Sequence, residues 1–214
     1  HRFVIWLPEV WWSDRELLST LTSLLTTIFG HPPELLSNDV AEAQQQYNGT
    51  VLNTTFLQTT AESGTDPRAI NPLTIPLIAS DPALDSLRLG LVDCPDIQTG
   101  FLDGFKHESD ASMPQGEDLA ATRRDQLGRI GRLCSAFIIV SRLSSLHDEG
   151  LLQILTTLRD AMPGVPRILA INKVKSRYAP EVVFDEARAL VDRFGINSVF
   201  AAYDYRSSLA EQRI

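Results

Sequence analysis

The chain has 214 residues, of which 43% are hydrophobic, and its formal net charge is -8 at pH 7. This length suits one globular α/β domain, or a domain with a large insertion. The acidic balance argues against nucleic acid as the main partner and against a polybasic membrane contact. No stretch reaches about 18 uninterrupted apolar residues, so we expect no direct membrane span, and we expect a cytoplasmic location.

The first third of the chain predicts one strand, one helix and a long polar segment. The apolar run "RFVIWLP" at 2–8 predicts a strand. Ser13 and Glu16 have the spacing of a capping box, and leucines at helical spacing follow them. Residues 34–70 are rich in Asn, Gln, Thr and Ser, so we expect a short helix near 39–47 and then a long loop or insertion.

Two further apolar segments, "LTIPLIAS" at 73–80 and "LRLGLVD" at 87–93, predict strands. The connection between them is short, which favours an antiparallel hairpin. Residues 98–116 are rich in Gly, Ser, Asp and Pro, so we expect another loop there.

From residue 117 onward, predicted helices and strands alternate. The helices are 117–134, 148–162 and 180–194, and the strands are 135–142, 167–172 and 198–204. The strand at 135–142 is continuously apolar, which is typical of a parallel strand covered on both faces. We therefore predict an α/β, doubly wound, mostly parallel sheet with one antiparallel hairpin strand.

In such a sheet, ligands bind outside the carboxyl ends of the strands. Three predicted strands lead into polar residues at that point. These are "DCPD" at 93–96, "NKVK" at 172–175 and "YD" at 203–204. The order of these strands, helices and polar turns resembles a P-loop GTPase domain, nearest to the dynamin-like or translation-factor branch, over roughly residues 73–204.

The resemblance implies a GTPase-like nucleotide-binding domain that uses GTP and Mg²⁺. Asp93 matches the Asp of Asp-x-x-Gly, which in that family supports the magnesium ion through water, a role that suits a hard cation. Asn172 and Lys173 match the start of Asn-Lys-x-Asp, where the Asn ties loops together and the Lys stem covers the base. Ala201 and Ala202 fall where the family has a Ser-Ala-Lys-type base contact.

Several positions depart from the family's pattern. Asp96 stands where the family has Gly, and a carboxylate there would repel the terminal phosphate unless it turns away. Lys175 stands where the family has an Asp that accepts two hydrogen bonds from guanine, and a lysine has donors only. Thr74 and Asp96 are the switch candidates, and Thr60 is an equally arguable switch threonine.

The Walker A sequence GxxxxGK[ST], which cradles phosphates with backbone N–H groups and a lysine, is absent from the 214 residues. Two interpretations remain open. In one, 2–8 is the first strand of the sheet and "EVWWSD" at 9–14 replaces the phosphate loop. In the other, the Walker A lies upstream of His1, and 2–8 with its helix belongs to an insertion.

These patterns lead to two functional hypotheses for a single GTPase-like domain at 1–214, which we expect to be a fragment of a longer protein. The first is a nucleotide-binding domain that hydrolyses GTP in the full-length protein. The second is a catalytically inactive pseudo-GTPase that binds a protein partner or the rest of its own chain. The departures at Asp96 and Lys175 and the missing Walker A favour the second. A third interpretation is an unrelated doubly wound binding domain whose motifs match by chance, since Asp and Pro are good turn formers at a strand end.

Overall fold

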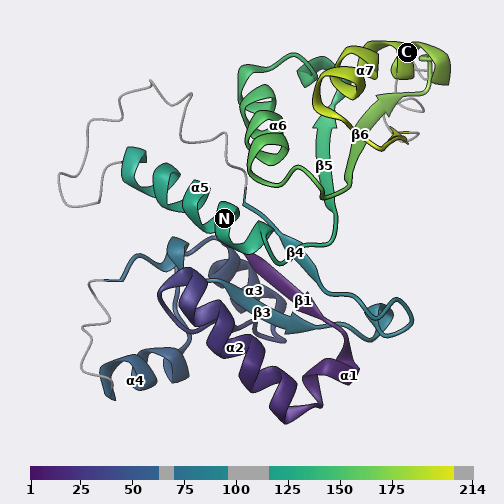
Figure 1. Ribbon diagram of the computed structural model, residues 1–214. Coiled ribbons are helices and arrows are strands. Elements are labelled where there is room, and N and C mark those ends of the chain that lie inside the picture. Colours follow the sequence, from purple (N-terminus) through teal and green to yellow (C-terminus); the bar gives the residue numbers. More distant parts are fainter. Residues whose placement is uncertain (63–69, 96–115, 205–214) are drawn as a thin grey trace, which may run out of the picture. The chain divides into compact units, whose positions relative to one another are not determined.

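A computed structural model describes residues 1–62, 70–95 and 116–204 of the chain (Figure 1). Two compact units are present, His1–Arg129 and Ile130–Ile214. The fold is mixed α/β with mostly parallel strands, as the sequence predicts, and within the described ranges one pair of strands is antiparallel. None of the helices in these ranges is both long enough and apolar enough to cross a bilayer.

The first unit contains a four-stranded sheet with helices packed around it. Its elements are β1 (Val4–Leu7), α1 (Glu9–Trp12), α2 (Arg15–Phe29), β2 (Glu34–Leu35), α3 (Val40–Tyr47), α4 (Thr54–Glu62), the 3-10 turns η2 (Pro72–Thr74) and η3 (Pro82–Leu84), β3 (Leu77–Ser80), β4 (Leu91–Asp93) and α5 (Gly116–Gly131). The strand order is β2-β3-β1-β4. β1 and β2 run parallel to β3, whereas β4 runs antiparallel to β1.

The predicted hairpin between 73–80 and 87–93 is wrong, because β1 lies between β3 and β4. β1 and β3 carry buried side chains at nearly every position, so they occupy the middle of the sheet. β4 has three residues, and its Leu91 and Asp93 are exposed, as suits an edge strand. The antiparallel strand is thus present, but its partner is β1.

Local sequence signals set the bounds of α2. The Asp14 carboxylate accepts hydrogen bonds from the N–H groups of Glu16 and Leu17, both at 3.1 Å. Asp14 is therefore the N-cap, which corrects the expectation for Ser13; the Ser13–Glu16 spacing predicted the helix but not its cap. Gly30 ends the helix with φ of 81°, a left-handed conformation that favours glycine.

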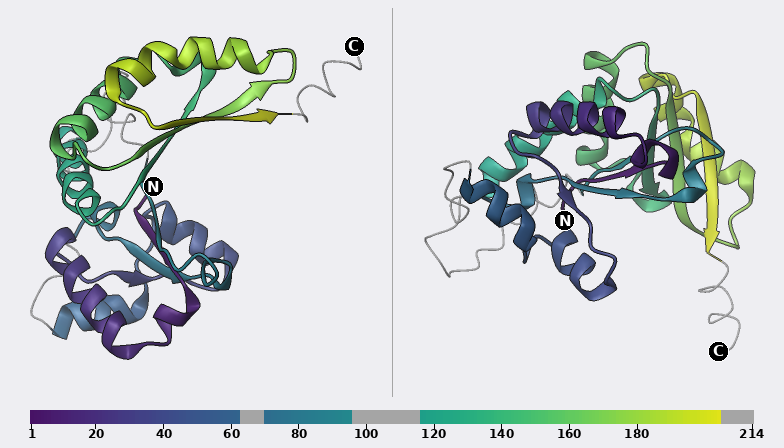
Figure 2. Two further views of the ribbon diagram at one scale, coloured as in Figure 1. Left: turned by 45° about the vertical axis from the view of Figure 1, so that its right-hand side comes forward. Right: turned by 90° about the horizontal axis from the view of Figure 1, so that it is seen from below.

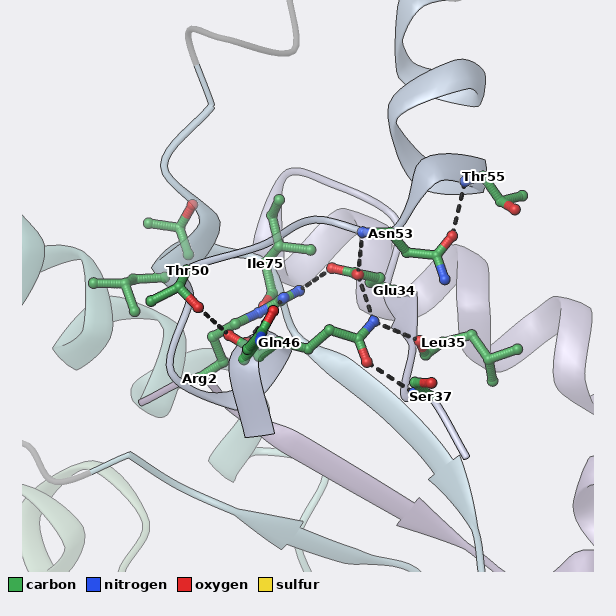
Figure 3. Close-up of polar contacts among 12 residues, drawn as sticks. Arg2, Glu34, Leu35, Ser37, Gln46, Thr50, Asn53, Thr55 and Ile75 are labelled. Carbon is green, nitrogen blue, oxygen red and sulfur yellow. Dashed lines mark hydrogen bonds and ion pairs between the residues drawn. The ribbon is translucent and has the colours of Figure 1, made fainter. Parts of the chain in front are cut away.

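Residues 34–62, the described part of the polar segment 34–70 before residue 70, contain more regular structure than expected. α3 confirms the short helix predicted near 39–47, but α4 replaces the first part of the expected loop. A buried polar network links the start of the chain to this segment, as Figure 3 shows. Arg2 pairs with Glu34 at 2.7 Å, and Glu34 also accepts hydrogen bonds from the Gln46 side chain and the Asn53 N–H, both at 2.6 Å.

The second unit is a parallel three-stranded sheet in the order β5-β6-β7. Its elements are β5 (Phe137–Arg142), the 3-10 turn η5 (Leu143–Ser145), α6 (Glu149–Ala161), β6 (Arg167–Lys175), α7 (Pro180–Phe194) and β7 (Ser198–Asp204). α6 and α7 lie on one side of this sheet (Figure 2, left). The core between them contains Leu151, Leu155, Leu169, Ile171, Val183 and Phe194.

The opposite face of this sheet is open within the second unit. Val140, Ala170 and Phe200 are neighbours across the three strands, and Val140 and Phe200 are 63% and 60% exposed. The expectation that the strand at 135–142 is covered on both faces is therefore met on one face only.

Candidate functional site

In one of the two interpretations of the sequence, the segment between β1 and α2 replaces the phosphate-binding loop. Here it forms the single turn α1, and its backbone N–H groups are already in use. Trp11 and Trp12 donate to the Pro8 carbonyl at 3.0 and 3.1 Å. The N–H groups of residues 13 and 14 donate to the carbonyls of residues 9 and 11 at 3.0 and 3.3 Å. A phosphate at this position would find these donors occupied.

The backbone N–H groups at the start of α2 also donate to an acceptor of the protein. The N–H groups of a first helical turn attract anions because they lack intrahelical partners. In this chain the Asp14 carboxylate accepts two of them, from Glu16 and Leu17. The anion at this helix end is thus supplied by the protein itself.

Carboxylates also surround the carboxyl ends of β1 and β3. Glu9 accepts a hydrogen bond from the Ser80 hydroxyl at 2.7 Å, and Asp85 accepts one from the Val10 N–H at 3.2 Å. These two carboxylates would repel a phosphate placed beside them. The donor set here therefore does not fit the triphosphate that the sequence resemblance implies.

Asp93, the predicted magnesium-supporting residue, lies at the other end of β1. Because β4 is antiparallel, Asp93 is opposite Val4, whereas Leu91 is opposite Trp6 nearer α1. Loss of hydration raises the pKa of the Asp93 carboxyl, although the side chain keeps contact with solvent. Desolvation, and then the charge of Asp93, raise the pKa of Tyr47. The structure therefore places Asp93 near Tyr47 and apart from the segment that follows β1.

Thr74, a switch candidate, lies in the 3-10 turn η2. Its hydroxyl donates to the Asn71 carbonyl at 2.8 Å, and its own carbonyl accepts from the Gln126 side chain at 3.0 Å. These contacts give Thr74 a structural role in the turn. Asp96, the other switch candidate, lies outside the described residues, and the Thr60 side chain is likewise not described.

The predicted base-contact residues come together in the second unit. Asn172 and Lys173 lie in β6, between the paired positions 171 and 174, where the register with β7 shifts. Ala201 pairs with Ile171 and Tyr203 pairs with Val174, so Ala202 faces the two-residue bulge. Both Asn172 and Lys173 are exposed, and Ala201 packs against the core.

The bulge holds an unusual backbone conformation. Lys173 has φ of 55°, a left-handed conformation that is uncommon for a residue other than glycine. The Asn172 side-chain oxygen accepts the Lys173 N–H at 2.8 Å and thereby supports this turn. Such local strain is concentrated at functional sites, so the bulge is the second candidate site.

Residues missed by the sequence interpretation are Glu9, Asp14 and Asp85. For Glu9 and Asp14 the signal was visible in "PEVWWSDRE" at 8–16, where acidic residues fall in the segment that would need glycines and a lysine, whereas Asp85 lies in "DPALDS" at 81–86. Within the described ranges, no cluster of three or more His, Cys, Asp or Glu side chains could hold a metal ion. Comparison of the chain with protein-family models, with curated proteins and with solved structures found no match.

Proposed function

We propose that this chain is a GTPase-like domain without catalytic activity that works as a protein-interaction module. Its partner is another protein or a further part of the same polypeptide. Nucleotide hydrolysis would need a phosphate site with free N–H donors and a cation at the carboxyl end of β1.

One observation carries this proposal: the N–H groups at the β1–α2 junction are satisfied by the chain itself. Residues 10–14 donate to protein acceptors, and Asp14 caps α2. The position of Asp93 at the opposite end of β1 gives independent support, because a magnesium-supporting carboxylate has to lie near the phosphates.

A titration of the 214-residue chain with fluorescent GTP and ATP analogues, with and without Mg²⁺, tests the proposal. We expect no Mg²⁺-dependent binding at millimolar nucleotide. Asp93→Ala is the matched variant, and we expect it to behave as the unchanged chain does. Mg²⁺-dependent binding of GTP that Asp93→Ala weakens would overturn the proposal.

A second candidate function is the binding of a nucleobase at the β6 bulge, and the left-handed Lys173 opposite Ala202 favours it. NMR titration with guanosine and with adenosine tests this function without a phosphate site. We expect shifts at residues 172, 173 and 202, and Lys173→Gly should keep the fold because glycine adopts positive φ freely. Lys175→Asp should raise the preference for guanosine, since it restores an acceptor.

If neither nucleoside shifts these signals, the bulge is a structural feature of β6, and this second function is rejected. The interaction-module proposal does not depend on that result, because the observations that support it lie in the first unit.

A further inference from the structure

The first unit exposes a surface of aromatic and aliphatic side chains, which we call the tryptophan patch. Its members are Val10, Trp11, Trp12, Leu87, Leu89 and Leu91. The two segments that form it lie together at the α1 end of β1 in Figures 1 and 2. The Val10 N–H donates to Asp85 at 3.2 Å, and a Cβ on Gly90 would lie 3.6 Å from the Trp11 ring. These contacts bring the two segments that carry the patch against each other.

The patch is accessible to a partner. Leu87 is 62% exposed, Val10 53% and Leu91 44%. Trp11 and Trp12 are each partly exposed. A gathering of exposed apolar side chains with a polar border marks an interaction site, and tryptophan is enriched among the residues that dominate binding energy.

The two segments that carry the patch are acidic. Residues 8–16 and 80–91 carry five carboxylates and two arginines. The carboxylates are Glu9, Asp14, Glu16, Asp81 and Asp85, and the arginines are Arg15 and Arg88. This balance attracts a cationic partner and repels anionic lipid and nucleic acid. It also disfavours a second copy of the chain, because acidic segments of both copies would meet.

From this geometry we infer that the tryptophan patch is the docking surface for a basic amphipathic segment of a partner protein. Apolar side chains of that segment would cover Trp11 and its neighbours, while Lys and Arg side chains would meet Glu9 and Asp85. The inference rests on the proposed function, and it names the surface and the class of partner.

The chain provides its own probe for this surface. It has three tryptophans, and these are Trp6, Trp11 and Trp12, all in β1 or α1. We would titrate the 214-residue chain with an amphipathic peptide of leucine and lysine and follow tryptophan emission. A matched peptide with glutamate in place of lysine reports the role of charge. We expect saturable binding of the lysine peptide with a blue shift, weakened by salt.

Two sets of variants test whether binding of the peptide depends on the tryptophan patch or only on the overall negative charge of the chain. The double variant Glu9→Gln/Asp85→Asn keeps oxygen acceptors for Ser80 and Val10, and we expect it to weaken binding about three- to tenfold. Asp192→Asn, which removes an exposed carboxylate from α7, should leave the affinity unchanged. Trp11→Ala should weaken binding at least as much as the double variant.

Equal binding of the lysine and glutamate peptides would overturn the inference, as would an equal loss with Asp192→Asn. Dimerisation that sedimentation detects and that Trp11→Ala abolishes would assign the patch to a second copy of the chain instead.

The nucleotide titration distinguishes this inference from the proposed function. If that titration shows no Mg²⁺-dependent binding and the lysine peptide also fails to bind, this inference falls and the proposed function stands. If Mg²⁺-dependent GTP binding is found, the proposed function falls whatever the peptide does.

Discussion

At the scale of single residues, Arg2 anchors a buried polar network in the first unit. The side chain is fully buried, pairs with Glu34 at 2.7 Å and donates to the Ile75 carbonyl at 2.8 Å. Removing one partner of a buried ion pair leaves the other charge without compensation.

We predict that Arg2→Ala lowers the free energy of unfolding by about 3–5 kcal/mol, measured by urea denaturation. The matched control is Arg188→Ala, since Arg188 pairs with Asp185 at 2.8 Å on an exposed helix surface. That change should cost less than about 1 kcal/mol. Equal losses for the two variants would show that the Arg2 network is not buried.

Asp93 gives a prediction of pH dependence. Partial desolvation raises its pKa in the folded state, so protonation favours folding, and this contribution is lost as pH rises through the folded pKa. We predict that Asp93→Asn stabilises the chain slightly at neutral pH and has no such effect at a pH below the unfolded pKa.

The same variant has a second measurable effect. Because the Asp93 charge helps to raise the pKa of Tyr47, Asp93→Asn should lower the pKa of that phenol, while desolvation continues to hold it above its usual value. Ultraviolet titration, with Tyr47→Phe to assign the signal, measures this shift. An unchanged Tyr47 pKa would contradict the placement of Asp93 beside Tyr47.

At the scale of elements, periodicity and turn signals predicted most of what is observed. α2, α3, α6 and α7 lie close to the ranges that the sequence predicted for them. β6 is longer than predicted, because Asn172 and Lys173 form a bulge that lets the strand continue to Lys175 instead of ending it. Single-residue patterns carry no signal for such a bulge.

Strand partners were less predictable than strand positions. A short connection suggested that 73–80 and 87–93 pair, but pairing depends on how much apolar surface each strand buries in the sheet. The buried β1 and β3 pair in parallel, and β4 takes the edge beside β1. Either partner would make β4 antiparallel to β1 and place Asp93 at the end of β1 away from α1. The predicted site was therefore wrong because it treated 87–93 like a parallel strand that ends beside the other carboxyl ends.

At the scale of the whole molecule, the two compact units have separate buried cores. The core of the second unit draws its buried side chains from Ile139 through Ile196, and Leu155 is fully buried in it. We predict that Leu155→Ala costs about 2–5 kcal/mol, because it removes contacts and leaves a cavity.

Hydrogen exchange followed by mass spectrometry locates this effect. Protection in the Leu155→Ala variant should fall across β5, β6, β7 and their helices, and should stay unchanged in β1 and β3. An equal loss of protection in β1 would show that the two units unfold as one.

The proposed function depends on Asp93 and the β1–α2 junction lying at opposite ends of β1. Nuclear Overhauser measurements between backbone protons of β1 and β4 would establish this arrangement in solution. We expect antiparallel cross-peaks, including short Hα–Hα contacts at alternate opposed pairs among Val4–Asp93, Ile5–Val92 and Trp6–Leu91. A parallel pattern that placed Asp93 beside Leu7 would overturn the assignment, because it would bring this carboxylate to the end of β1 where a phosphate site would lie.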